Sequence, residues 1–172
     1  MEKFDFNIYL IGFMGAGKST VSKELQKRLD MDIAEMDQMI VDNQGMPISD
    51  IFAKYGEDYF RDVETKTLIE LKEKGSTIVS CGGGIVVREE NTAHMKDNGK
   101  VVLLTATPET ILERVKDSNE RPILNDNMNV EFITNLMEKR REKYLAVADL
   151  CVATDGKSAS EICDEIISAL KK

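Results

Sequence analysis

The stretch IYLIGFMGAGKST, residues 8–20, decides the fold of this chain. A short apolar run with the character of a β-strand leads into a turn with spaced glycines, and Lys-Ser-Thr follows at once. Residues 12–19 match the phosphate-binding pattern G-x-x-x-x-G-K-S/T in full. Glycines let backbone N–H groups approach phosphate oxygens, and the helix that follows offers its N-terminal dipole to the anion. A glycine-rich turn without a ligand is the alternative, but the residues on both sides favour a nucleotide-binding loop.

The residues of this loop, 12–20, have separate expected roles. We expect Lys18 to neutralise the β- and γ-phosphates of the nucleotide and the Ser19 hydroxyl to ligate Mg²⁺. Nucleotide contacts are expected from Gly15, Ala16, Gly17, Lys18, Ser19 and Thr20. The loop alone does not separate a kinase from a GTPase or a mechanical ATPase, but the chain lacks the guanine-reading N-K-x-D motif. In a chain of 172 residues, phosphoryl transfer to a small molecule is therefore the leading class.

Segments with strand character alternate with segments with helix character along the chain. The expected strands are the apolar runs at 7–11, 31–37, 76–81, 100–106 and 149–154. The expected helices span 18–30, about 49–75 with an interruption at Gly56, a segment that begins at Thr107-Pro108, and 158–170 behind a Ser158-x-x-Glu161 capping box. This alternation predicts an α/β fold in which helices flank a five-stranded parallel sheet, with ligands at the carboxyl ends of the strands. We expect one domain over residues 1–172, because no linker or repeat divides the chain.

Composition and charge exclude several other classes of protein. Hydrophobic residues make up 42% and charged residues 31% of the chain, which is typical of a globular protein. The formal net charge of −8 argues against nucleic acid as the main partner. No apolar stretch reaches the roughly 18 residues that span a membrane, and the N-terminus does not read as a signal peptide. The three cysteines are far apart and form no CxxC pair, so we expect reduced thiols in a cytoplasmic protein.

Two arginines lie where the sequence predicts apolar surroundings. Arg61 falls in an apolar helical pattern and has Glu64 one turn later. Arg140 lies on a stripe with Ile133 and Tyr144 that faces inward by its spacing. A guanidinium on a core-facing stripe needs an anionic partner, and two that converge can bind a carboxylate bidentately. Internal ion pairs, Arg61 with Glu64 and Arg140 with another acid, are the alternative.

Five segments carry a resemblance to a known family. The chain resembles the shikimate kinases over about residues 7–170, in GFMGAGKST (12–20), IFAKYGEDYFRDVE (51–64), SCGGG (80–84), ERP (120–122) and RREKYLAVADL (140–150). The resemblance implies a P-loop kinase with a substrate-binding helical region at about 36–64 and a mobile lid at about 115–128. It implies a phosphotransferase that uses ATP and Mg²⁺ to phosphorylate the 3-hydroxyl of shikimate. The product, shikimate 3-phosphate, lies on the route to chorismate and the aromatic amino acids.

The resemblance assigns roles on the acceptor side. Arg61 and Arg140 would bind the carboxylate of shikimate. A triple glycine after a buried-looking strand allows close backbone approach to a ligand, and the match places Gly82, Gly83 and Gly84 along the substrate pocket, with a backbone contact at Gly83. A flexible turn is the alternative for these glycines.

Three catalytic residues follow from the resemblance: Lys18, Asp37 and Arg121. Asp37 would hydrogen-bond the acceptor hydroxyl and accept its proton, although a cap for the following helix is the alternative. Arg121 would reach from the lid to the nucleotide and the transferring phosphoryl group, whereas an exposed loop arginine is the alternative. Arg114 and Lys157 fall where the family contacts adenine.

One position departs from the family pattern. The family usually carries Asp-x-Asp at the end of the second strand, and this chain has Glu35-Met36-Asp37. The first acid is longer by one methylene. A carboxylate that meets Mg²⁺ only through water tolerates that extra length, since Mg²⁺ commonly keeps several waters. We therefore expect Ser19 to ligate the metal directly and Glu35 to act through water.

Two other functions stay open on the sequence. A kinase of the same architecture could act on gluconate or a nucleoside monophosphate, but two arginines beside a triple glycine favour a carboxylate-bearing alcohol. A nucleotide-binding regulator with little turnover is the second alternative, and Asp37 and Arg121 argue against it. The expected partner is the small molecule shikimate, without nucleic acid or membrane, and the expected oligomeric state is a monomer.

Overall fold

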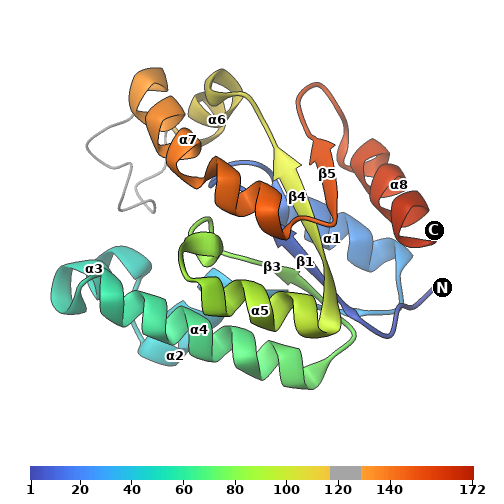
Figure 1. The fold of residues 1–172 in the computed structure, drawn as a ribbon, viewed down its shortest axis with the longest axis horizontal. Helices are drawn as coiled ribbons and strands as arrows, with labels where there is room; N and C mark the ends of the chain where they lie inside the picture. The colour runs from blue at the N-terminus through green and yellow to red at the C-terminus, as the bar shows by residue number, and fades with distance from the viewer. Residues whose placement is uncertain (117–128) are drawn as a thin grey trace.

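A five-stranded sheet forms the centre of the computed structural model, which describes residues 1–116 and 129–172 (Figure 1). Its strands are β1 (Asn7–Ile11), β2 (Asp32–Glu35), β3 (Thr77–Ser80), β4 (Gly99–Thr105) and β5 (Leu150–Ala153). The order is β2-β3-β1-β4-β5, and all neighbouring strands are parallel. The structure therefore confirms the predicted parallel sheet, with β1 and its phosphate loop in the middle.

The helices follow the strands in alternation, as the sequence predicts. They are α1 (Lys18–Arg28), α2 (Met36–Gln44), α3 (Ile48–Tyr55), α4 (Glu57–Lys74), α5 (Glu89–Asn98), α6 (Pro108–Val115), α7 (Val130–Val147) and α8 (Ala159–Leu170), with a short 3₁₀ helix η1 (Ile85–Val87). Gly56 separates α3 from α4 at φ 88°, a backbone conformation that glycine adopts readily. The capping box of Ser158 and Glu161 is present at the start of α8.

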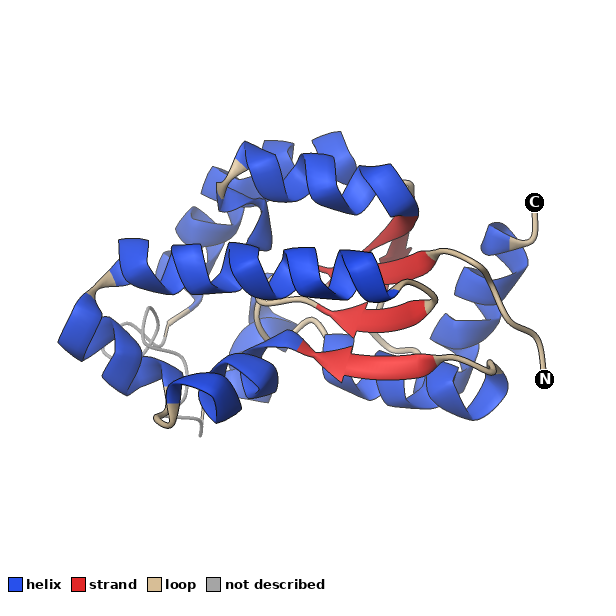
Figure 2. Cartoon of the chain, turned by 90° about the horizontal axis from the view of Figure 1, so that it is seen from below, coloured by secondary structure: helices blue, strands red, loops and turns tan. Residues whose placement is uncertain are grey.

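Alternate residues of the central strands face two separate cores. Ile8 and Leu10 of β1 pack with residues of α1, α6 and α8, whereas Tyr9 and Ile11 pack with residues of α4, α5 and α7. These neighbouring residues are fully buried, because helices cover both faces of the sheet (Figure 2). Because both faces of the sheet are covered, these successive residues are all apolar, which explains the continuous apolar runs in the sequence.

A third apolar cluster lies beyond the carboxyl ends of the strands. It joins Ile40 of α2, Ile51 of α3 and Phe60 of α4. In Figure 2 these helices extend past the strand arrowheads, at the end of the molecule opposite the two termini. The cluster holds the N-terminal part of α4 over the edge of the sheet where ligands of parallel sheets bind.

The second strand is shorter than the sequence predicts. We expected a strand over residues 31–37, but β2 ends at Glu35 and α2 begins at Met36. Asp37 therefore lies in the first turn of α2, where its acidic side chain suits the helix dipole. The N-cap position belongs to Glu35, so Asp37 is not the cap of this helix.

Candidate active site

The phosphate loop joins the end of β1 to the start of α1. Gly12, Gly15 and Gly17 all have positive φ, at 148°, 83° and 105°. A Cβ atom on Gly15 would lie 2.7 Å from the side chain of Val115, so the glycine also allows α6 to pack closely. The Lys18 ammonium curls back over the loop and donates hydrogen bonds to the backbone oxygens of Gly12 (2.6 Å) and Phe13 (3.0 Å). The loop thus has the form that the motif predicts.

Two serines and one carboxylate lie beside the loop at the start of α1. Ser19 Oγ donates to Glu35 Oε2 at 2.9 Å, and Ser22 Oγ lies 3.0 Å from Glu35 Oε1. In the described residues, no three or more His, Cys, Asp or Glu side chains gather to hold a metal alone. A hydroxyl and one nearby carboxylate fit Mg²⁺, which takes oxygen ligands and is held mainly by phosphates and water in such sites. The donor set therefore fits the metal expected at Ser19.

Arg61 is buried on α4 and has two acidic neighbours. Its Nη1 donates to Glu64 Oε1 at 3.0 Å, and its Nε donates to Glu57 Oε2 at 3.3 Å. The pair of Arg61 and Glu64 is the internal ion pair that the sequence left open. However, Glu64 is only 1% exposed, and its second oxygen, Oε2, has no hydrogen-bond partner among the described residues. Burial raises the pKa of the Glu64 carboxyl, and the charge of Arg61 opposes that shift.

Arg140 is buried on α7 and differs from Arg61. Among the residues that the structure describes, no acid forms an ion pair with it, and its Nη1 lacks any hydrogen-bond partner. The guanidinium lies 5.9 Å from the centre of the Phe13 ring. A buried guanidinium N–H without an acceptor is costly unless a ligand supplies one. The unpartnered N–H of Arg140 is therefore available to an acceptor from a ligand.

The glycines at 82–84 provide room for these charged groups. A Cβ atom on Gly82 would lie 2.8 Å from Glu64 Oε2 and 2.9 Å from Asp37 Oδ1, and one on Gly84 would lie 2.5 Å from Arg61 Nη1. Gly83 lies against the phosphate loop, since its Cβ position is 3.2 Å from the backbone nitrogen of Met14. The triple glycine thus brings the arginine site and the phosphate loop together.

Tyr144, one turn after Arg140, fixes the glycine segment from the other side. Its hydroxyl donates to the backbone oxygen of Gly83. Burial raises the pKa of this phenol, so it stays protonated and can donate the bond. A Cβ atom on Gly83 would lie 3.6 Å from Arg140 Nη1. The stripe on α7 therefore places both a guanidinium and a backbone anchor at the glycines.

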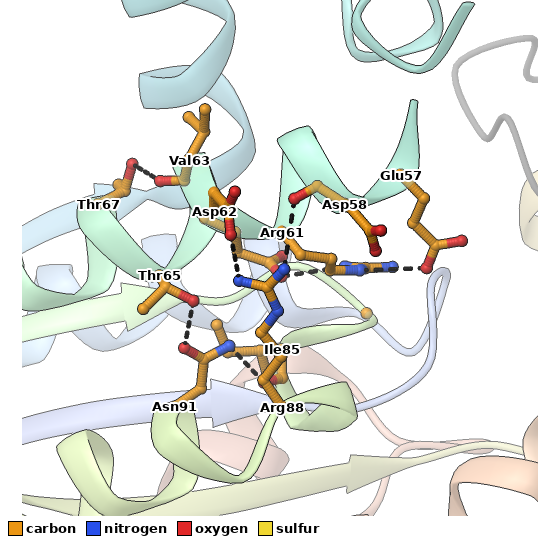
Figure 3. A network of polar contacts seen from close by, with 12 residues as sticks. Glu57, Asp58, Arg61, Asp62, Val63, Thr65, Thr67, Ile85, Arg88 and Asn91 are labelled. Carbon is orange, nitrogen blue, oxygen red and sulfur yellow. Dashed lines mark hydrogen bonds and ion pairs between the residues drawn. The ribbon is translucent and has the colours of Figure 1, made fainter. Parts of the chain in front are cut away.

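A polar network holds the arginine helix to the segment that follows the glycines (Figure 3). Asn91 of α5 is fully buried, accepts from Thr65 Oγ1 at 2.8 Å and donates to the backbone oxygen of Ile85 at 3.0 Å. Arg88 donates to Asp62 Oδ1 at 2.6 Å on the exposed side of α4. These bonds tie α4, which carries Arg61, to η1 directly after the triple glycine.

One cavity of about 710 Å³ connects the phosphate loop to the two arginines. Most of the predicted site residues that the structure describes line it, namely Gly15, Gly17, Lys18, Ser19, Thr20, Glu35, Asp37, Arg61, Gly82, Gly83, Gly84, Arg114 and Arg140. Phe52 and Phe60 form part of the same wall, with ring centres 5.0 Å apart. The cavity thus extends from the phosphate loop to the two buried arginines.

Three predicted residues, Ala16, Lys157 and Arg121, do not line the cavity or lie outside the described residues. Ala16 is buried. Lys157 does not line the cavity, and its Nζ forms an ion pair with Glu165 Oε1 at 2.6 Å. Arg114 donates to the backbone oxygen of Gly15 at 2.9 Å, which braces the loop. Arg121 and nearly all of the expected lid at about 115–128 lie outside the described residues. The roles of Lys157, Arg114 and Arg121 at the nucleotide stay predictions.

Sequence reasoning missed two polar residues that organise the site. Ser22 lies three residues after Ser19, and this helical spacing on one face could have indicated it. Asn91 lies in a polar helix far from every motif, and no pattern in the sequence marks it as buried.

The fold and the cavity define the chain as a P-loop kinase for a small acceptor with an anionic group. A family model described as shikimate kinase matches residues 14–171. The shikimate kinase of Dehalococcoides mccartyi is 42% identical over 166 residues, which cover 96% of this chain and 94% of the relative. That of Persephonella marina is also 42% identical, with coverage of 96% and 99%.

A solved structure agrees with these sequence matches. Shikimate kinase from Acinetobacter baumannii, in complex with shikimate, superposes with a TM-score of 0.94 at 31% identity, covering 98% of this chain and 94% of that chain. The chain therefore belongs to the shikimate kinase family. Enzymes of this family are phosphotransferases that use ATP with Mg²⁺. In the described part of the chain, no helix combines the length and apolarity needed to cross a membrane.

Proposed function

We propose that this chain transfers the γ-phosphoryl group of ATP to the 3-hydroxyl of shikimate, giving shikimate 3-phosphate and ADP. One observation carries the choice of acceptor. Arg140 is buried in the cavity with an unpaired N–H among the described residues, beside Arg61 and the triple glycine. The carboxylate of shikimate satisfies that guanidinium, and the rest of the small ring fits between Phe52, Phe60 and the glycines.

The predicted catalytic residues divide the reaction between them. Lys18 neutralises charge on the phosphates, and Arg121 does so on the transferring group. Ser19, and Glu35 through water, would hold Mg²⁺, which would supply further neutralisation of the phosphate oxygens. Asp37 lines the same cavity, where it positions the acceptor hydroxyl and accepts its proton.

The lid and the nucleotide contacts belong to the same proposal. Residues of about 115–128 close over the nucleotide, and closure excludes water that would otherwise accept the phosphoryl group. Gly15, Ala16, Gly17 and Thr20 contact the phosphates, while Arg114 and Lys157 contact the adenine side.

The enzyme acts as a single-domain monomer in the cytoplasm, in the supply of chorismate and aromatic amino acids. Its net charge of −8 disfavours nucleic acid as a partner. The described cysteines Cys81, Cys151 and Cys163 are free thiols, which suits a reducing compartment.

The test is ADP release, measured in a coupled assay with shikimate, gluconate, AMP or no acceptor. We expect a rate with shikimate that far exceeds the rates in the other three arms. Equal rates with and without shikimate, from folded protein with Mg²⁺, would exclude the proposed acceptor. A high rate with gluconate or AMP alone would instead identify a kinase with another substrate.

A further inference from the structure

Ser22 lies one turn after Ser19 in α1 and contacts Glu35, which lines the cavity. It is fully buried, and its Oγ lies 3.0 Å from Glu35 Oε1. The other oxygen of the same carboxylate, Oε2, accepts from Ser19 Oγ at 2.9 Å. Glu35 is therefore held at both oxygens by two serines of one helix face, and only Ser19 belongs to the phosphate-binding motif.

The single proton of the Ser22 hydroxyl has two acceptors in reach. One is the backbone oxygen of Ser19 at 2.9 Å, and the other is the Glu35 carboxylate at 3.0 Å. A carboxylate is the stronger acceptor, because a hydrogen bond to a charged group is roughly twice as strong as one between neutral groups. The geometry therefore favours donation from Ser22 to Glu35, where it stabilises one rotamer of the carboxylate.

A glutamate needs such an anchor more than an aspartate does. The extra methylene adds a rotatable bond, and each bond that must be fixed costs conformational entropy. With Oε1 held by Ser22, Oε2 stays at the Ser19 hydroxyl and accepts its hydrogen bond. The lone pairs of Ser19 Oγ then point away from Glu35 and remain available to a cation.

We propose that Ser22 is a positioning residue for the divalent metal: it fixes Glu35, and Glu35 in turn orients the Ser19 hydroxyl that ligates Mg²⁺. This inference rests on the proposed function only in requiring that the nucleotide binds together with Mg²⁺. Ser22 touches neither nucleotide nor acceptor in this account, so its effect passes entirely through the Glu35 carboxylate.

The test is the affinity for ADP, measured by calorimetry at saturating Mg²⁺ and again with a chelator. The proteins are the wild type, Ser22→Ala, Glu35→Ala and the double variant. Alanine is favourable inside a helix, so Ser22→Ala should fold normally. Thr67→Val is the matched control, because Thr67 is also a buried helical hydroxyl, and among the described residues it donates to the backbone oxygen of Val63 alone.

We expect Ser22→Ala to weaken Mg²⁺-dependent ADP binding by roughly three- to tenfold. Removing a group that contacts a direct metal ligand typically lowers metal affinity tenfold to hundredfold. We expect a smaller loss for Ser22→Ala, because Ser22 acts on the metal only through Glu35. ADP affinity in the chelator should stay within about twofold, because a partner of a metal ligand affects only the metal-dependent binding. In the Glu35→Ala background, Ser22→Ala should have no further effect, since its target is gone. Thr67→Val should match the wild type in both conditions.

Three outcomes would overturn the inference. They are an unchanged Mg²⁺ dependence in Ser22→Ala, an equal loss with and without metal, and a full loss that persists in the Glu35→Ala background. None of them bears on the acceptor, because the measurement contains no shikimate. A failure of the proposed function would appear only in the ADP-release assay, while the metal dependence of ADP binding could still follow the expected pattern.

Discussion

The phosphate loop and the arginine site are built in opposite ways. The loop comes from one continuous stretch, residues 12–19, and its lysine bonds to backbone oxygens of that same stretch. The arginine site is assembled from α2, α4, the glycines at 82–84 and α7, and it keeps buried polar atoms without partners in the described residues. A local motif can satisfy itself, whereas a site assembled from distant segments leaves groups that only a substrate completes.

The two arginines sharpen that comparison, since Arg61 has an ion-pair partner and Arg140 has none among the described residues. Arg61→Ala would leave Glu64, which is 1% exposed, without its ion pair. We expect a loss of about 3–5 kcal/mol in the free energy of unfolding at neutral pH. Arg140→Ala removes a guanidinium with no such pair, and we expect a change below about 1 kcal/mol. Urea unfolding of both variants measures the difference.

The loss in Arg61→Ala should depend on pH in a defined direction. Burial already raises the pKa of folded Glu64, and loss of Arg61 raises it further. A group whose folded pKa exceeds its unfolded pKa stabilises the fold below the unfolded value and loses that stability as pH rises. The deficit should therefore shrink as pH falls towards the ordinary range of a glutamate. A pH-independent deficit would show that packing, and not the buried charge, causes the loss.

Substitution of Asp37 should have the next largest effect. Asp37 lines the same cavity as the phosphate loop and the two arginines. Asp37→Asn keeps the shape of the side chain but removes the proton acceptor, so kcat should fall by roughly 10²-fold or more. The KM for ATP should change little. Steady-state kinetics with both substrates measures this, and a kcat close to that of the wild type would mean that Asp37 is not the proton acceptor.

A single methyl group added at Gly84 should weaken shikimate binding and leave ATP binding nearly unchanged. The Cβ atom of Gly84→Ala would meet the Arg61 guanidinium at 2.5 Å and displace it. We expect the KM for shikimate to rise about tenfold, since a displaced charge loses one bidentate contact. The KM for ATP should stay within about twofold, because Gly84 is not in the phosphate loop. An equal rise in both constants would contradict this separation of shikimate binding from ATP binding.

The smallest effect is expected where the chain departs from its family, at Glu35. Glu35→Asp should keep kcat within roughly tenfold, because a carboxylate acting through water tolerates a shorter reach. Glu35→Gln should mainly raise the Mg²⁺ concentration needed for half of the maximal rate. A Mg²⁺ titration of the initial rate separates these effects. If Glu35→Gln were inactive at saturating Mg²⁺, Glu35 would contact the metal directly.

The contrast also explains what could be predicted from the sequence. The order of strands and helices followed from alternation, and the glycines of the loop followed from a contiguous motif. The end of β2 was wrong by two residues, because Met36 and Asp37 suit a strand end and a helix start about equally. Asn91 and the bond of Tyr144 to Gly83 depend on contacts between distant segments, and spacing along one chain does not encode these. Ser22 is different, because its helical spacing from Ser19 could have indicated it.

The partnership of Arg140 with the substrate carboxylate is the central claim, and a ligand–protein cycle tests it directly. Calorimetry would compare shikimate with its carboxamide, on the wild type and on Arg140→Ala. On the wild type, the carboxamide should bind about 2–5 kcal/mol more weakly, the scale for losing one partner of a desolvated charge pair. On Arg140→Ala, shikimate should bind as weakly as the carboxamide does on the wild type, and the carboxamide should lose little more. An equal penalty for the carboxamide on both proteins would contradict the claim, because the carboxylate would then be bound by another group.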